Sequence, residues 1–238
     1  MYHKNPKHKV LKTPEFKEVV YDEHRWLLLR KLRGIAADLM KVLVQCSYLP
    51  ILHGSVARGD VDRESDVDIA ILHTTSPAIF EACLDRWGLK VYRKIVLRAT
   101  PTSTMRVIYE LSSSGDIAVS IPLEKLNPRE TEFYKFGGGI SYEELVKDIR
   151  VPGVTKSLIL VVPTEGGHRA APVVGYEHYV AKLLGISVDT VTERIRILSR
   201  RDDVGRTGLF FKVVLDPSEP VENVVQGKLK RPDRRREA

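Results

Sequence analysis

The chain has 238 residues, of which 43% are hydrophobic and 29% charged, and a formal net charge of +7. This length suits one catalytic domain with a small second domain, and the apolar content is sufficient for a buried core. No apolar run reaches the roughly 18 to 20 residues of a membrane span, and the basic N-terminus lacks the apolar stretch of a signal peptide, so we expect a cytoplasmic protein without a membrane partner.

The positive charge is concentrated at the two ends. Residues 1–13 contain four lysines and no acid, and residues 226–238 contain six basic and two acidic residues, which leaves a net charge of −1 on the rest. We expect two basic flexible tails, which either attract polyanions by counterion release or only add solubility.

Cys46 and Cys83 are the only cysteines, and each lies in a segment with the pattern of a buried element. Two thiols cannot form a four-cysteine zinc site, and we expect no disulfide framework. Glutamine occurs only at Gln45 and Gln226 while charged residues are abundant, a bias that favours a thermophile as the source.

The first half of the chain alternates helical and β patterns. Apolar residues at helical spacing predict one long helix over roughly 14–46, or two helices with a break near Gly34, opened by Thr13-Pro14. The predicted elements that follow are a strand at 48–52, a loop at 53–65, a strand at Val67–Leu72, a helix at Pro77–Gly88, and β-rich runs at Leu89–Arg98, Thr104–Leu111 and Asp116–Ile121.

The second half predicts a domain boundary near 150–155, and hence a catalytic domain at 14–152 and a smaller domain at 153–225. Before the boundary we expect a helix with three aromatic residues in the core and a triple-glycine break. After it we expect a strand at Ser157–Pro163, a turn at Gly166–His168 and helices over 175–201. The core aromatics are Phe133, Tyr134 and Phe136.

Two acids stand at the mouth of an otherwise apolar strand. Asp66 and Asp68 share one face of that strand because side chains alternate, and two like charges so close resist ionising together. A divalent cation removes this conflict, and carboxylate oxygens suit Mg²⁺ or Mn²⁺. We expect a third carboxylate on a neighbouring strand, with Asp116 the first candidate and Glu110 the second.

The turn before this strand provides groups for phosphate. Gly54 allows close approach of a ligand, the hydroxyls of Ser55 and Ser65 can donate to phosphate oxygens, and Arg58 offers a guanidinium fork. The spacing of Gly54 and Gly59 resembles an ATPase phosphate-binding loop, but Asp60 and Val61 stand where that loop needs Lys and Ser or Thr.

The pattern G-S-x-A-R-G followed by S-D-x-D-I resembles the signature of the DNA polymerase beta-like nucleotidyltransferase superfamily, in particular its minimal archaeal and bacterial members. The resemblance covers residues 51–72 by motif and 35–122 by architecture. It implies two metal ions held by Asp66, Asp68 and Asp116, a nucleoside triphosphate (ATP is expected) with its β- and γ-phosphates at Gly54 and Ser55, and attack of an acceptor hydroxyl on the α-phosphate. His53 departs from the family, where an apolar or aromatic residue often precedes the glycine.

The C-terminal segment has the pattern of a helix-turn-helix. Ala181 is small where two helices would cross, Gly185 permits a left-handed turn, and Ser187 can cap the next helix. That helix could present basic side chains to DNA, with residues 208–215 as a wing strand, or it could be a helical hairpin packed on the catalytic domain. The basic side chains are Arg194, Arg196, Arg200 and Arg201.

We therefore predict an α+β fold, with a mixed, mainly antiparallel sheet flanked by helices, followed by a small winged-helix-like domain. The predicted function is metal-dependent transfer of a nucleoside monophosphate to an acceptor hydroxyl, with release of pyrophosphate. The acceptor can be a protein, an RNA or a small molecule. The alternative is a nucleic-acid-binding regulator or toxin–antitoxin partner whose nucleotidyltransferase fold is vestigial.

Overall fold

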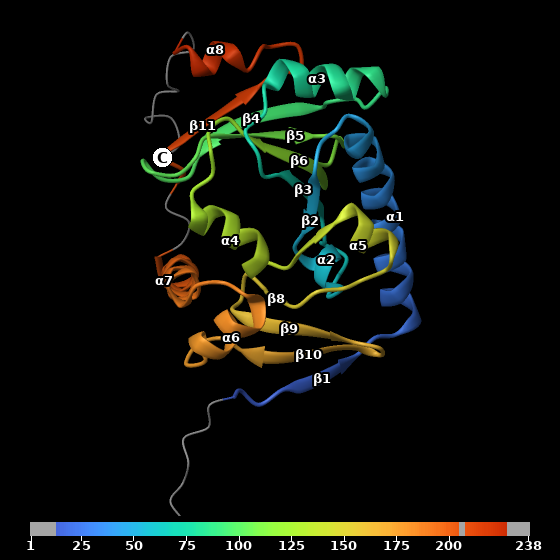
Figure 1. The fold of residues 1–238 in the computed structure, drawn as a ribbon, viewed down its shortest axis with the longest axis vertical. Helices are drawn as coiled ribbons and strands as arrows, with labels where there is room; N and C mark the ends of the chain where they lie inside the picture. The colour runs from blue at the N-terminus through green and yellow to red at the C-terminus, as the bar shows by residue number, and fades with distance from the viewer. Residues whose placement is uncertain (1–12, 205–207, 228–238) are drawn as a thin grey trace, which may run out of the picture.

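A computed structural model describes residues 13–204 and 208–227, which form two β-sheets with helices around them (Figure 1). The predicted tails at 1–13 and 226–238 lie almost wholly outside these residues. The larger sheet has the order β11-β4-β5-β6-β3-β2-β7 and the smaller one β1-β10-β9-β8. All neighbours pair antiparallel except β3 and β6, which are parallel. The prediction of a mixed, mainly antiparallel sheet flanked by helices is confirmed.

The strands of the larger sheet are β2 (Pro50–His53), β3 (Val67–Ile71), β4 (Arg93–Arg98), β5 (Arg106–Glu110), β6 (Ile117–Pro122), β7 (Gly139–Ser141) and β11 (Phe211–Leu215). Those of the smaller sheet are β1 (Lys17–Val20), β8 (Gly153–Val154), β9 (Ile159–Thr164) and β10 (Gly167–Pro172). The helices are α1 (Glu23–Gln45), α2 (Ser55–Arg58), α3 (Pro77–Arg86), α4 (Pro128–Phe136), α5 (Tyr142–Val146), α6 (Glu177–Leu184), α7 (Val188–Val204) and α8 (Glu222–Val225). None of the described helices combines the length and the apolar character that crossing a bilayer requires.

The two faces of the larger sheet are covered differently. Val67, Ile69 and Ile71 alternate along β3 and are buried in the core that also contains residues of α1 and α3. On the opposite face α4 packs over only part of the sheet (Figure 1), and Tyr134 of α4 belongs to one buried cluster with Ala70 of β3. The face that carries Asp68 is therefore partly open, and the site described below lies there.

Helix α1 begins later than predicted. Asp22, not Thr13, caps it, because the Asp22 carboxylate accepts a hydrogen bond from the backbone amide of Arg25 at 2.8 Å. The preceding residues 17–20 form the edge strand β1, which pairs with β10. The helix then runs through Gly34 without a break. The expected turn at Gly166–His168 also lies partly in a strand, since β10 begins at Gly167.

The predicted wing strand belongs to the other sheet. Residues 211–215 form β11, which pairs antiparallel with β4 from Phe211 opposite Arg98 to Leu215 opposite Lys94. Leu215 and the following Val221 and Val224 are buried in the main core. The predicted wing strand is therefore wrong. These residues instead form the edge strand of the larger sheet, to which the chain returns after the smaller sheet and helices α6 and α7.

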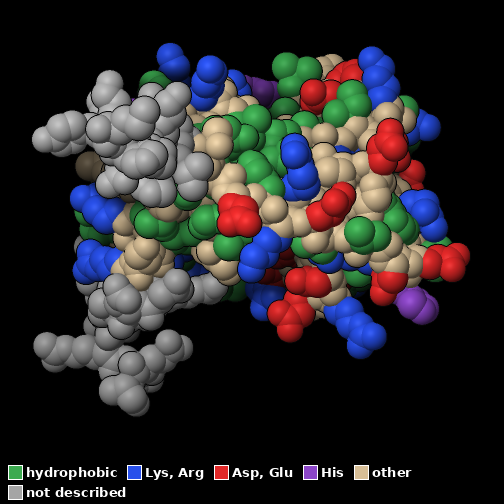
Figure 2. Space-filling model, turned by 90° about the horizontal axis from the view of Figure 1, so that it is seen from below, with side chains coloured by type: hydrophobic (Ala, Val, Ile, Leu, Met, Phe, Trp, Pro, Cys, Tyr) green, Lys and Arg blue, Asp and Glu red, His purple; other side chains and the backbone are tan. Residues whose placement is uncertain are grey.

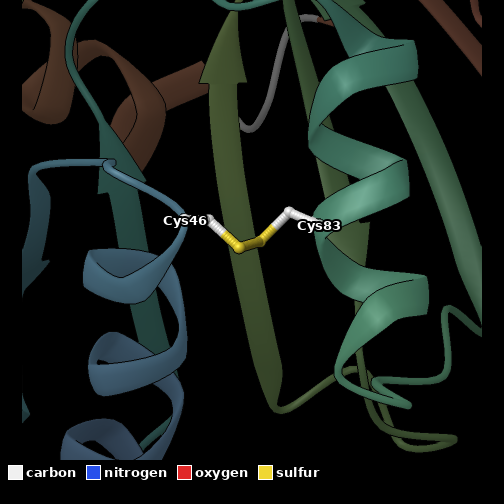
Figure 3. Close-up of a disulfide and its surroundings, with 2 residues drawn as sticks. All are labelled: Cys46 and Cys83. Carbon is white, nitrogen blue, oxygen red and sulfur yellow. A yellow bond between two sulfur atoms is a disulfide. The ribbon is translucent and has the colours of Figure 1, made fainter.

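A disulfide corrects the expectation drawn from the cysteines. Cys46, at the end of α1, is bonded to Cys83 of α3, with 6.1 Å between their Cα atoms (Figure 3). The two residues are separated by 37 positions, and only the packing of both helices on one face of the sheet brings them together. Sequence spacing alone could not reveal this pairing.

Reduction of this disulfide should lower the free energy of unfolding by about 3–4 kcal/mol, because opening a loop of this size restores entropy to the unfolded chain. Urea denaturation with and without dithiothreitol measures the change. A Cys46→Ala/Cys83→Ala variant is the control, and its transition should not respond to dithiothreitol. Identical transitions of the wild type under both conditions would contradict the prediction.

Candidate active site

The turn after β2 is built around a residue that only glycine suits. Gly54 has φ +85° and ψ −151°, and no atom lies within 4 Å of the position where a Cβ would stand. Its amide donates to the carbonyl of Gly138 at 3.0 Å, which ties the turn to the loop before β7. The turn therefore has an open side, where a ligand can approach the backbone.

Two of the predicted phosphate-binding hydroxyls lie together beside this turn. The Ser55 hydroxyl donates to the Ser65 Oγ at 3.1 Å, and Ser65 accepts from the backbone amide of Asp62 at 2.9 Å. The loop between α2 and β3 thus folds back on the turn. Gly54, Ser55 and Ser65 are brought into one place, as their proposed common ligand requires.

The carboxylate pair lies next to the same turn. Asp68 is directly opposite His53 in the antiparallel pairing of β2 and β3, and His53 is the residue before Gly54. Burial, together with the negative charge of Asp66, raises the pKa of Asp68 to about 6, while the charge of Lys156 opposes the shift. The pair therefore has the unrelieved negative charge that a cation would neutralise.

The backbone of the third predicted ligand, Asp116, lies beside the start of β3, where its carbonyl accepts a hydrogen bond from the amide of Val67 at 2.7 Å. In the parallel pairing of β3 with β6, the residue beside Asp68 is Ala118, which has no ligand atom. Asp116 lies before β6, where it accepts hydrogen bonds from the hydroxyls of Ser112 and Ser114, both at 2.5 Å. Those two bonds lower the pKa of Asp116, as does, more weakly, the charge of Lys31 in α1.

The second candidate, Glu110, is bound to Arg93 at 2.6 Å. Within residues 13–204 and 208–227, no group of three His, Cys, Asp or Glu side chains could hold a metal ion. The Asp116 carboxylate thus lies near the strand of the other two acids but is held by two serine hydroxyls, and its role as a metal ligand stays a prediction.

Arg58 has a different role from the predicted one. Its Nε and Nη2 each donate to a carboxylate oxygen of Asp60 at 2.9 Å, and its Nη1 donates to the carbonyl of Gly137 at 2.6 Å. Arg58 as a whole is 6% exposed. Because each of its three guanidinium nitrogens already donates a hydrogen bond inside the protein, Arg58 clamps the turn to the glycine loop (Gly137–Gly139) instead of presenting its charge to phosphate.

A pocket of about 220 Å³ opens from Asp68 across the sheet towards β4. Its polar lining includes His53, Ser120 and Arg106, and Arg106 donates to the hydroxyl of Tyr134 at 2.8 Å. Burial, together with the charge of Arg106, lowers the pKa of His53 to about 4, so this imidazole is neutral at physiological pH. Sequence reasoning missed Arg106, although it stands on the same strand face as Ile108, opposite the buried Val107 and Tyr109.

The aromatic residues before the glycine loop divide between core and pocket. Tyr134 and Phe136 are buried, as predicted. Phe133 is only partly buried and lines the pocket, where its ring lies 4.8 Å from the guanidinium carbon of Arg194. A base-sized group could reach Phe133.

The predicted helix pair is present, but its second helix faces the protein. Gly185 has the left-handed φ of 62° between α6 and α7, and the Ser187 hydroxyl accepts a hydrogen bond from the amide of Thr190. However, the hydroxyls of Ser187 and Thr190 both donate to Glu132 of α4. The start of α7, which would have to enter a DNA groove, is therefore bound to α4, and the helical-hairpin alternative fits the structure better.

The four arginines of α7 also separate. Arg194 is partly buried and Arg201 exposed, and both line a cavity beside α4, whereas Arg196 and Arg200 are exposed and do not line it. On the face of the molecule that Figure 2 shows, basic and acidic side chains are interspersed with each other and with apolar ones. The described residues of that face thus form no large patch of one charge, and the basic side chains of α7 that a ligand could meet in a cavity are Arg194 and Arg201.

A family model described as the nucleotidyltransferase domain matches residues 29–101. The match spans less than a third of the chain, from α1 to the end of β4, and includes the Gly54 turn and both aspartates, but not Asp116. No curated protein and no solved structure matches the chain. The family match supports nucleotidyl transfer as the general activity.

Proposed function

We propose that the protein transfers a nucleoside monophosphate from a nucleoside triphosphate, with ATP the expected donor, to an acceptor hydroxyl. Gly54, Ser55 and Ser65 receive the β- and γ-phosphates, and Asp66 and Asp68 hold a divalent cation beside them. The observation that carries this proposal is the direct pairing of Asp68 with His53, because it fixes the carboxylate pair next to the turn at Gly54 and Ser55 (the phosphate turn).

The two aspartates fit one Mg²⁺ or Mn²⁺ ion. Both are oxygen donors, their mutual repulsion favours a cation, and magnesium completes its shell with water and substrate phosphate oxygens. The two ions that the resemblance implies would need a third carboxylate, and that of Asp116 is held by Ser112 and Ser114. We therefore propose a single protein-held ion, which when bound would neutralise charge that develops on the transferred phosphate.

The side chains of this chain act mainly by positioning. The oxygen of the acceptor bonds to the α-phosphorus, the bond from that phosphorus to the bridging oxygen breaks, and the electron pair leaves with pyrophosphate, while the acceptor proton goes to water. Ser55 and Ser65 hold the leaving phosphates on the β2 side of Asp68. The pocket over β6 and β5 leaves the opposite side free for the acceptor. Alignment of the two reactants is itself a large part of the rate enhancement.

Calorimetric titration with ATP tests the donor site. The wild type should bind ATP in the presence of Mg²⁺, and Asp66→Ala/Asp68→Ala should lose this binding because the cation that bridges protein and phosphate is no longer held. Asp38→Ala/Asp85→Ala is the matched control, since it makes the same change of charge at exposed positions on α1 and α3. Equal heats for the wild type and the Asp66/Asp68 variant would refute the proposed site.

A further inference from the structure

A second cavity, of about 710 Å³, lies between the loop after β4, the start of α4, and α7. It shares Leu97, Arg106 and Phe133 with the smaller pocket at Asp68, so the two adjoin at these residues, and we call them together the hollow. In the sheet order, β2 with the phosphate turn lies on one side of β3, and β6, β5 and β4 lie on the other. The hollow therefore starts at Asp68 and leads away from the phosphate turn.

Two arginines of this cavity form no ion pair with another described side chain. Arg129 is bound to Glu193 at 3.0 Å and Arg106 lies 3.5 Å from Glu130, but no ion pair joins Arg194 or Arg201 to another residue of the described part of the chain. These two are seven positions apart on α7 and therefore share a helix face. The charge of Glu193 acts on Arg194 without pairing with it, so both guanidinium groups can donate to an anionic ligand.

Arg194 is the more constrained of the two. Its Nε is buried and has no hydrogen-bond partner among the described residues. Burial lowers the pKa of Arg194, and the nearby charge of Arg201 lowers it further. An anion bound between the two guanidinium groups would satisfy the unpaired donor and relieve the repulsion.

An aromatic surface lies at the junction of the two pockets. Phe133 lines both, and the Arg194 guanidinium covers its ring at 4.8 Å. Ring faces and guanidinium planes are the groups on which bases of single-stranded nucleic acids stack, and arginines follow their phosphates. A phosphopeptide would use the arginines but leave the aromatic surface without a matching group.

We infer that this hollow is the acceptor site and that the acceptor is the 3′ end of a single-stranded nucleic acid. Its terminal hydroxyl reaches Asp68, a base near the end stacks at Phe133, and a phosphate binds between Arg194 and Arg201. This inference rests on the proposed function, because it assigns the acceptor of the same reaction.

Fluorescence anisotropy with a short labelled single-stranded oligonucleotide tests the inference, with RNA and DNA of the same sequence in parallel arms. Arg194→Ala/Arg201→Ala should bind at least about tenfold more weakly than the wild type, since two charge-assisted contacts are lost. The slope of log affinity against log salt should be shallower by about 0.7, because the two arginines together neutralise one phosphate. Arg196→Ala/Arg200→Ala removes the same charge from the same helix outside the cavity and should stay within about twofold, because surface arginines of that kind contribute little.

A fold defect is controlled by a single variant. Arg201 is exposed, so Arg201→Ala should keep the wild-type melting temperature and still bind more weakly than Arg200→Ala. Equal losses in the cavity pair and the control pair would mean unspecific attraction and would overturn the inference, as would undiminished binding by both pairs. Stronger displacement of the oligonucleotide by a phosphopeptide than by unlabelled oligonucleotide would also overturn it.

The two proposals fail separately. Metal-dependent ATP binding without selective oligonucleotide binding would overturn the acceptor assignment and leave the donor site standing. Selective oligonucleotide binding without metal-dependent ATP binding would remove the proposed function, and with it the assignment of the hollow as an acceptor site.

Discussion

Asp68→Asn should reduce nucleotidyl transfer by about a thousandfold. Asparagine keeps the size of the side chain but removes the charge that holds the cation, and loss of one such electrostatic contact typically costs this much. Release of pyrophosphate from ATP in the presence of the oligonucleotide acceptor measures the rate. Because Asp68 lies beside the phosphate turn, the variant should also lose metal-dependent ATP binding.

The same substitution should stabilise the metal-free protein. The pKa of Asp68 is raised to about 6 in the fold, above its ordinary value of 3.8, so its charged form destabilises the folded state at neutral pH. The free energy of unfolding of Asp68→Asn should therefore exceed that of the wild type at pH 7 in the presence of a chelator. This difference should shrink as pH falls from 6 to 4, where Asp68 becomes protonated in the wild type. A less stable variant at pH 7 would contradict the assigned environment.

Asp116→Asn distinguishes a metal site formed by Asp66 and Asp68 alone from one that also includes Asp116. The structure holds this carboxylate with Ser112 and Ser114. We expect its transfer rate to stay within about threefold of the wild type, because no transition-state contact is lost. A loss as large as that of Asp68→Asn would mean that Asp116 moves to the metal when substrate binds, and that the single-ion proposal is wrong.

Gly153→Ala should cost about 2–4 kcal/mol of stability and most of the activity. A Cβ on Gly153 would stand 2.5 Å from the amide nitrogen of Gly138 and 2.7 Å from the carbonyl carbon of Gly137, and backbone atoms cannot yield as flexible side chains can. The clash displaces the loop whose Gly138 carbonyl holds the amide of Gly54. Urea denaturation and pyrophosphate release measure the two effects.

Gly166→Ala is the matched control for this substitution. No atom lies within 4 Å of its added Cβ, and its φ is not in the left-handed region, so we expect a change in stability of less than about 1 kcal/mol and normal activity. Equal stability and activity of the two variants would mean that the close packing of β8 against the glycine loop contributes nothing to the free energy of unfolding.

The sequence predicted the parts of the site that depend on local pattern. The alternation of β3 places Asp66 and Asp68 with an apolar opposite face, and the short motif predicts the turn at Gly54. Both follow from the strand period and from glycine chemistry, which neighbours in sequence determine. The mixed α and β architecture could be predicted for the same reason, because strand and helix patterns are also set by neighbours in the sequence.

The surroundings of Asp116 could not be predicted, because they depend on the register between β3 and β6 and on the turn before β6. Asp116 and Ala118 are two positions apart and would share a face of any strand that contained both. The structure pairs Ala118 with Asp68, joins the carbonyl of Asp116 to the amide of Val67, and holds the Asp116 carboxylate with Ser112 and Ser114. The hydrogen bonds of Arg58 could not be predicted either, because one of its three contacts is with the carbonyl of Gly137, which lies far along the chain.

The cavity could not be predicted, because segments far apart in the chain form it. Arg106, Phe133 and Arg194 come from β5, α4 and α7, and each has an ordinary structural explanation when considered alone. The arginines of α7 were noticed as a group, but helical spacing could not tell which two face a hollow. That distinction requires the packing of α7 on α4.

The pairing of β11 with β4 has a consequence for how the protein matures during translation. Residues 93–98 leave the ribosome long before residues 211–215 are synthesised, so β4 waits with one row of amides and carbonyls unpaired. Such a nascent sheet edge can bind other unfinished chains, which makes slow synthesis or early termination a route to aggregation. Only delivery of the late strand shields that edge, which couples completion of the chain to its solubility.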